Sequence, residues 1–225
     1  MKIYHYSNGF YEKLKKKRDG IWFTTSPHGY NGQSWLFRYE VGKNFNDLDY
    51  REYISEKNTS DIQWYICSLD EINYDNILCL NDEFAPLVKD IVTFRNMIDN
   101  TDFKTLSHPR GFCSFPKQCC GDTANLLWKY LQLEHNGKYN DFLQVKSGVK
   151  SKDNQSHAWV EFRKRIIIDI TADQFPDIDE RVIITSDKKY YEVFKNQMEN
   201  EPDFYKFRKE IRDELSDIFT QICNS

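Results

Sequence analysis

The chain has 225 residues, of which 40% are hydrophobic and 16% are aromatic. This content is sufficient for a packed core rich in Phe, Tyr and Trp, and it excludes wholesale disorder. With 35 acidic and 31 basic residues the net charge is -4, so the composition gives no reason to expect nucleic acid as a partner.

No stretch of the sequence has the length and apolar content of a membrane-spanning helix, and the first residues lack the apolar segment of a signal peptide. We therefore expect a cytoplasmic protein with no membrane contact, although export by a dedicated machine that needs no such signal stays open. The sequence does not predict the oligomeric state.

The first 80 residues predict a β-rich N-terminal region, which we expect to shape the substrate cleft or to form a small accessory domain. Strands are indicated at 21–25, 35–41 and 62–69, where aromatic and β-branched residues are concentrated. Residues 10–18 are expected to form a short helix. Composition alone places the boundary with the second region, residues 81–225, near residue 80.

The second region predicts a mixture of helices and strands. Apolar residues at three- and four-residue steps indicate helices at 83–100, from Cys120 to a terminator at Gly137, and near the C-terminus after Pro202. Between the first two helices, 101–118 is expected to be an irregular loop. Three strands are expected, at about 142–149, 156–162 and 165–171. Together these elements predict an α+β fold in which helices pack on an antiparallel sheet.

The chain has six cysteines, at positions 67, 79, 113, 119, 120 and 223. A cytosolic chain of this length does not need disulfides. The close spacing of Cys113, Cys119 and Cys120 raises the question of zinc, but it lacks the C-x2-C pairs of structural zinc sites. We therefore predict no metal site and no cofactor.

Three residues stand out as a candidate catalytic triad: Cys120, His157 and Asp169. A cysteine at the start of a helix lies in the positive end of the helix dipole, which favours the nucleophilic thiolate. A histidine on a strand can accept the thiol proton and later protonate a leaving amine. A carboxylate on the next strand can orient the imidazole and stabilise its cation. Each residue alone is most often structural, so the hypothesis depends on their joint occurrence.

The segments around these three residues resemble the core of the transglutaminase-like superfamily, which shares its catalytic logic with papain-like cysteine proteases. Over residues 110–175, the chain has the three motifs typical of that family: Cys120-Gly121-Asp122-Thr123-Ala124 followed by Leu126-Leu127, then His157-Ala158-Trp159-Val160-Glu161, then Asp169-Ile170-Thr171. The resemblance implies a transglutaminase-like fold, with the nucleophile helix packed on the sheet, and a protein or peptide substrate.

The resemblance also suggests secondary roles for two residues. The family often has Gly two residues before the nucleophile, where this chain has Gln118. Glutamines upstream of the nucleophile donate to the oxyanion in papain-like enzymes, so Gln118 is a candidate donor, although the backbone N–H of Cys120 is the stronger one. Trp159 is expected to pack beneath the histidine strand, with lining of the acyl site as the alternative.

The function predicted from these residues is acyl transfer from an amide through a Cys120 thioester. Water as acceptor would make the chain a protease or a Gln/Asn deamidase, and an amine would make it a transglutaminase; we favour hydrolysis. One alternative is a non-catalytic binding module on the same fold. Another is an NAD-dependent activity of the N-terminal region, because His5 and the segment 20–26 faintly resemble the opening of ADP-ribosyltransferase folds.

Two geometric predictions follow from the triad. His157 and Asp169 should lie on one face of the sheet, facing each other across a hairpin whose turn is centred on Arg163. This requires an odd-numbered loop, or a bulge that restores the phase. Cys120, rather than the adjacent Cys119, should be the reactive cysteine, because Cys120 fits the family spacing and successive residues at a helix start point in different directions.

Overall fold

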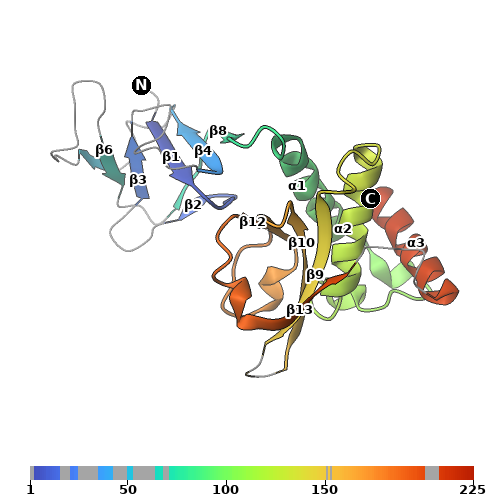
Figure 1. The fold of residues 1–225 in the computed structure, drawn as a ribbon. Coiled ribbons are helices and arrows are strands. Elements are labelled where there is room, and N and C mark those ends of the chain that lie inside the picture. Colours follow the sequence, from blue (N-terminus) through green and yellow to red (C-terminus); the bar gives the residue numbers. More distant parts are fainter. Residues whose placement is uncertain are drawn as a thin grey trace. The chain divides into compact units, whose positions relative to one another are not determined.

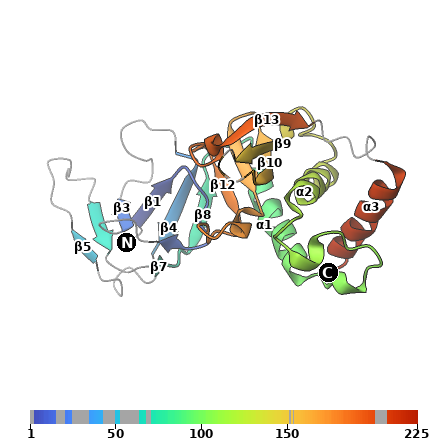
Figure 2. The ribbon, with the colours of Figure 1, turned by 90° about the horizontal axis from the view of Figure 1, so that it is seen from below.

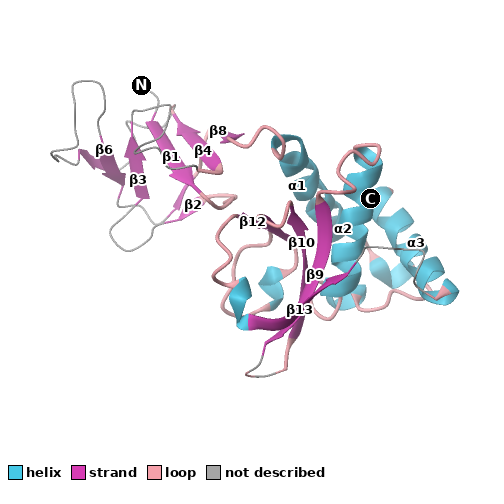
Figure 3. Cartoon of the chain, viewed as in Figure 1, coloured by secondary structure: helices cyan, strands magenta, loops and turns pink. Residues whose placement is uncertain are grey.

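The computed structural model describes residues 3–15, 21–24, 35–42, 50–52, 64–67, 71–150, 152, 154–200 and 208–225. The chain divides into two compact units, Met1–Ala85 and Pro86–Ser225, which are described separately. In the described residues the first unit contains only strands, whereas the second combines helices with strands (Figure 3). The α+β class predicted from the sequence is confirmed.

The first unit has a six-stranded antiparallel sheet with the order β5-β6-β3-β1-β4-β8 (Figure 1). Its strands are β1 (Ile3–Ser7), β3 (Ile21–Thr24), β4 (Phe37–Val41), β5 (Tyr50–Glu52), β6 (Trp64–Cys67) and β8 (Asn76–Cys79). A separate pair is formed by β2 (Leu14–Lys15) and β7 (Glu71–Ile72). Phe23, Phe37 and Tyr39 are fully buried in this unit, as expected for a core rich in aromatic residues.

The helix expected at 10–18 is wrong over the residues that the structure describes there. Phe10 and Leu14 are both buried at a spacing of four, which imitates one face of a helix. In the structure Leu14 belongs to β2 and pairs with Ile72, so a partner distant in sequence supplies the backbone hydrogen bonds. Residues 16–18 lie outside the described residues.

The second unit has a five-stranded antiparallel sheet with the order β12-β11-β10-β9-β13. Its helices are α1 (Ala85–Asn100), α2 (Cys120–Glu134) and α3 (Lys209–Cys223), and its strands are β9 (Leu143–Lys150), β10 (Ser156–Phe162), β11 (Ile166–Asp169), β12 (Ile183–Thr185) and β13 (Phe194–Asn200). Helix α2 packs along β10 and β9 and lies between this sheet and α3 in both views (Figures 1 and 2). Leu126, Leu127 and Leu131 are its buried apolar face.

The segment 101–118 is irregular, as predicted, apart from two short 3-10 helices, η2 (Phe103–Thr105) and η3 (Phe112–Ser114). The strands β12 and β13 were not predicted. The C-terminal helix begins at Lys209, and the part of its predicted apolar stripe at 202–207 lies outside the described residues. None of the helices that the structure describes is long and apolar enough to cross a membrane.

The hairpin between β10 and β11 sets the geometry of the candidate triad. Val160 pairs with Ile168 and Phe162 pairs with Ile166, so three residues form the loop and its centre is Lys164. The loop is odd-numbered as predicted, but the expected centre at Arg163 is wrong by one residue. Arg163 and Lys164 both have positive φ, and the N–H of Arg165 donates to the carbonyl of Phe162. His157 and Asp169 therefore share a face in diagonal, rather than directly opposite, positions.

Candidate functional site

Cys120 is the first residue of α2, and Cys119 is its N-cap. The helix begins here because the loop before it turns sharply: Gln118 has a φ of 66° and Cys119 accepts from the N–H of Thr123. Asp122 in the first turn complements the helix dipole and forms an ion pair with Arg110, with Nε and Oδ2 2.6 Å apart. Around Gly121 there is open space, since a Cβ added there would meet nothing within 4 Å.

The side chains of Cys119 and Cys120 lie in different environments. Cys119 is buried and its Sγ is 3.6 Å from the carbonyl oxygen of Pro116; burial is the main cause that raises the pKa of this thiol to about 12. Cys120 is only partly buried, and its thiol lies within hydrogen-bond reach of His157, the backbone N–H of Ala158 and the Gln174 amide. The structure thus brings Cys120, and not Cys119, to His157.

Burial acts to raise the pKa of Cys120. The hydrogen bond and positive charge of His157, with the donors of Ala158 and Gln174, outweigh that effect and lower the pKa of the thiol below its ordinary value. The helix start adds to this in the same direction, because its free N–H groups favour a negative charge. Cys120 therefore has the environment of a reactive cysteine.

His157 and Asp169 form a buried pair, with His157 Nε2 2.5 Å from Asp169 Oδ2 and both side chains shielded from solvent. A carboxylate only accepts hydrogen bonds, so Nε2 carries a proton and Nδ1 is the ring nitrogen left for proton exchange. Burial acts to lower the pKa of His157, but the charge and hydrogen bond of Asp169, together with the contact to Cys120, raise it to about 9. A thiolate beside an imidazolium is the state that these two shifts favour.

Asp169 is held by donors on both of its oxygens. The backbone N–H and the hydroxyl of Thr171 donate to Oδ1, at 2.9 and 3.1 Å, and the Tyr191 hydroxyl donates to Oδ2 at 2.8 Å. Burial acts to raise the pKa of Asp169, but His157, Thr171 and Tyr191 lower it below its ordinary value. The carboxylate is therefore kept charged and fixed in orientation despite complete burial.

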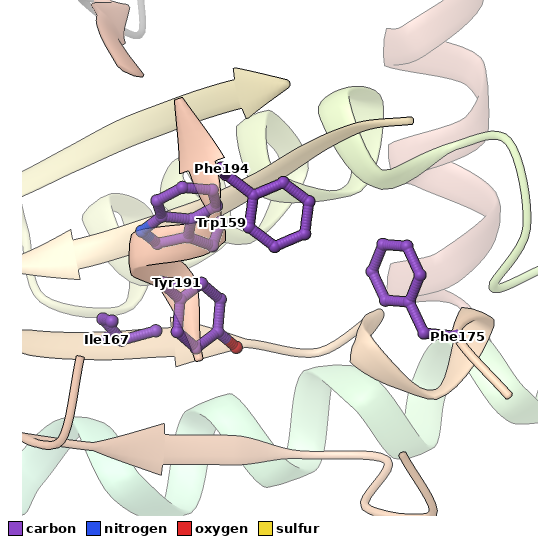
Figure 4. Packing of buried hydrophobic residues seen from close by; sticks show 5 residues of the cluster. All are labelled: Trp159, Ile167, Phe175, Tyr191 and Phe194. Atoms are coloured by element: carbon purple, nitrogen blue, oxygen red, sulfur yellow. The ribbon is translucent and has the colours of Figure 1, made fainter. Parts of the chain in front are cut away.

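An aromatic cluster surrounds the imidazole of His157. Figure 4 shows five residues that form this cluster: Trp159, Ile167, Phe175, Tyr191 and Phe194. The ring centroids of Phe175 and Phe194 lie 5.0 and 5.4 Å from that of His157. Trp159 is buried among these residues, two positions along β10 from the histidine. The cluster keeps water from the His157–Asp169 pair.

Gln118, the candidate oxyanion donor from the sequence, has an exposed side chain. Its backbone is in the left-handed region, which favours glycine. The next residues, Cys119 and Cys120, turn into the helix from this point. Gln118 thus shapes the approach of the chain to α2.

Sequence reasoning missed two residues of the site, Gln174 and Tyr191. Gln174 lies in η4 (Ala172–Gln174), five residues after Asp169, and its Nε2 is 3.0 Å from His157 Nδ1. Tyr191 lies in η5 (Tyr191–Val193) and reaches Asp169 from 22 residues away. Neither has a periodic or spacing signal in the sequence.

In the first unit, His5 lies on β1 with its ring 6.0 Å from that of Phe23 and 5.9 Å from that of Tyr39. The histidine is thus among core aromatic residues of the sheet. The residues 21–24 of the segment that suggested an ADP-ribosyltransferase fold form β3, but Gly20, Thr25 and Ser26 lie outside the described residues. The NAD-dependent alternative stays a prediction from sequence.

Comparison with known proteins gives no family by which to interpret this site: no protein-family model, no curated protein and no solved structure matches the chain.

Proposed function

We propose that the chain is a cysteine-dependent acyl-transfer enzyme with a transglutaminase-like core, acting on an amide of a protein or peptide. The observation that carries the proposal is the position of the Cys120 thiol, at a helix start and within reach of a buried histidine whose other ring nitrogen is 2.5 Å from a buried carboxylate. The three motifs that resemble that superfamily contain these same residues. The cytoplasmic location predicted from the sequence stays a prediction.

The proposed reaction proceeds in two steps. The Cys120 proton passes to His157 Nδ1, and the thiolate attacks the amide carbon to form an S–C bond while the carbonyl π electrons move to oxygen. The tetrahedral intermediate collapses, the C–N bond breaks, and Nδ1–H protonates the leaving amine. The thioester then transfers its acyl group to water or to a second amine. Asp169 holds Nε2–H throughout and stabilises the imidazolium without taking its proton.

Hydrolysis is the favoured outcome of the second step, so we propose a protease or a Gln/Asn deamidase before a transglutaminase. The crosslinking members of the transglutaminase-like superfamily are usually larger and often depend on calcium. This sequence has no EF-hand-like loop. A non-catalytic binding module explains the site less well, since a buried ionic pair adds little stability compared with apolar packing.

The test is alkylation by iodoacetamide at pH 6, where an ordinary thiol is almost fully protonated, followed by mass mapping. Cys120 should react much faster than the other five cysteines, and His157→Ala should slow its reaction by at least about tenfold because the imidazolium is lost. The matched control is His135→Ala, which removes a histidine that pairs with Asp90 away from the sulfur. Equal labelling of all six cysteines would remove the proposal.

A further inference from the structure

The short helix η4 is rigidly attached to the rest of the second unit. Asp173 in its centre accepts from Arg95 Nη1 and Nη2, at 3.0 and 2.7 Å. Arg95 Nη1 also donates to the carbonyls of Ile170 and Arg181, on the two sides of η4. Arg95 is buried and its guanidinium lies 4.7 Å from the centre of the Phe115 ring. Gln174 is therefore presented to the site by a fixed backbone.

The side-chain amide of Gln174 meets two different acceptors. Its Nε2 is 3.0 Å from the carbonyl oxygen of Thr171, which can only accept, so one N–H is committed to that oxygen. The same nitrogen is 3.0 Å from His157 Nδ1 and within hydrogen-bond reach of the Cys120 thiol. The second N–H thus lies where the proton of the nucleophile is exchanged.

The acceptor of the second Gln174 N–H depends on whether the exchanged proton is on the Cys120 thiol or on His157 Nδ1. When Nδ1 of His157 is unprotonated, its lone pair can accept from Gln174. When Nδ1 has taken the thiol proton, it has no lone pair left, and the N–H can donate only to the sulfur. On attack the negative charge leaves sulfur for the carbonyl oxygen, one carbon atom away. The donor is then next to the oxygen that has become charged.

We propose that Gln174 is a catalytic residue that donates its amide N–H to the oxyanion formed when Cys120 attacks the substrate carbonyl. The inference rests on the proposed function. The step forms the S–C bond and moves the carbonyl π electrons to oxygen, which the Gln174 N–H and the free backbone N–H of Cys120 stabilise. When the leaving amine takes the Nδ1 proton, the lone pair returns and Gln174 can donate to His157 again.

The experiment compares two reactions of the same thiol in the full chain. Acylation by p-nitrophenyl acetate passes through an oxyanion, whereas alkylation by iodoacetamide does not. Gln174→Met keeps the length of the side chain and removes its N–H groups. We expect its acylation rate constant to fall about 10²-fold, while its alkylation rate constant, measured on the high-pH plateau of the profile, stays within about twofold of the unchanged protein. Gln221→Met, on α3, where the amide Nε2 lies 3.4 Å from Thr105 Oγ1, is the control and should change neither rate.

The outcomes separate the two proposals. If Gln174→Met slows both reactions equally, Gln174 only positions the thiol, and if it slows neither, it has no role; each result overturns the inference while the nucleophile stands. If Cys120 of the unchanged protein is neither alkylated nor acylated preferentially, the proposed function itself fails. Gln174→Ala provides a second variant if the methionine side chain disturbs folding, which circular dichroism would show.

Discussion

The second unit contains two networks of buried charge, one around His157 and Asp169 and the other around Arg95. Both meet the segment that runs from Asp169 to Arg181. In the first, a carboxylate accepts from His157, Thr171 and Tyr191. In the second, a guanidinium donates to Asp99, to Asp173 and to two backbone carbonyls. Both charges are almost fully removed from solvent.

The networks differ in what their central cation can still do. The guanidinium of Arg95 is always protonated, and its Nε, Nη1 and Nη2 all donate to protein oxygens, so it only holds structure. His157 uses one nitrogen for Asp169 and turns the other toward the thiol of Cys120 and the Gln174 amide. Buried charge is thus common to both, and chemistry is expected only where one member can lose a proton beside a nucleophile.

The largest effect is expected from a substitution that breaks the first network. Asp169→Asn keeps the shape of the side chain but removes the charge that stabilises the imidazolium and fixes its tautomer, so acylation should fall by about 10⁴-fold with the fold retained. The rate with p-nitrophenyl acetate measures the loss of acylation, and the circular dichroism spectrum shows whether the fold is retained. The matched control is Asp99→Asn in the second network, which should leave acylation within about twofold. Equal rates for both variants would remove Asp169 from the mechanism.

Breaking the second network should act on stability instead. Arg95→Met leaves the partly buried carboxylate of Asp173 without its cation and two carbonyls without a donor, so the free energy of unfolding should fall by about 3 kcal/mol. Urea unfolding measures this loss. Arg181→Met, whose guanidinium is more exposed and contacts Asp99, should cost less than about 1 kcal/mol. If Arg95→Met lowered the free energy of unfolding no more than Arg181→Met does, this network would not hold the fold.

The pH dependence should follow the first network alone, because the guanidinium of Arg95 stays protonated over this range. The Cys120 thiolate forms as pH rises through its lowered pKa, so alkylation should fall about tenfold for each pH unit below that value. The imidazolium is lost as pH rises through about 9, so transfer from an amide should fall again there while alkylation does not. A midpoint for alkylation at or above the value of an ordinary cysteine would contradict the ion pair.

The smallest expected effect concerns Cys119. Its thiol is buried toward Pro116, so Cys119→Ala should change the alkylation rate of Cys120 by less than about twofold. Mass mapping of the iodoacetamide-treated variant measures this rate at the single position. If the fast reaction were lost in Cys119→Ala and kept in Cys120→Ala, the nucleophile would be Cys119 and the choice of Cys120 would be wrong.

The residues of the site that could be predicted lie on helices and strands that are recognisable in the sequence and close together along it. Cys120 begins a helix with an evident apolar face, and His157 and Asp169 lie on strands joined by a short loop, so sequence spacing alone brings them near each other. Gln174 and Tyr191 reach the site through 3-10 helices that only tertiary contacts position, such as the hold of Arg95 on Asp173. No pattern in the sequence reports such contacts.

The fold shows the same division. The helices α1 and α2 have clear apolar periodicity, the strands β9, β10 and β11 are rich in apolar residues, and all five were expected close to their observed bounds. Strand β13 has the sequence Phe-Lys-Asn-Gln-Met-Glu-Asn, an edge strand whose polar residues give no alternation, and it was missed. Its pairing with β9 includes an irregularity between Lys195 and Met198, which weakens any such signal further.

The register of the β10–β11 hairpin has a consequence for how the chain tolerates insertions and deletions. Removing one residue between His157 and Phe162, or between Ile166 and Asp169, would reverse the side of the sheet to which His157 or Asp169 points. Adding residues within 163–165 would leave both sides unchanged, because the pairing on either side of the turn stays as it is. A reporter peptide is therefore best inserted at this turn, between the two strand segments that cannot change length.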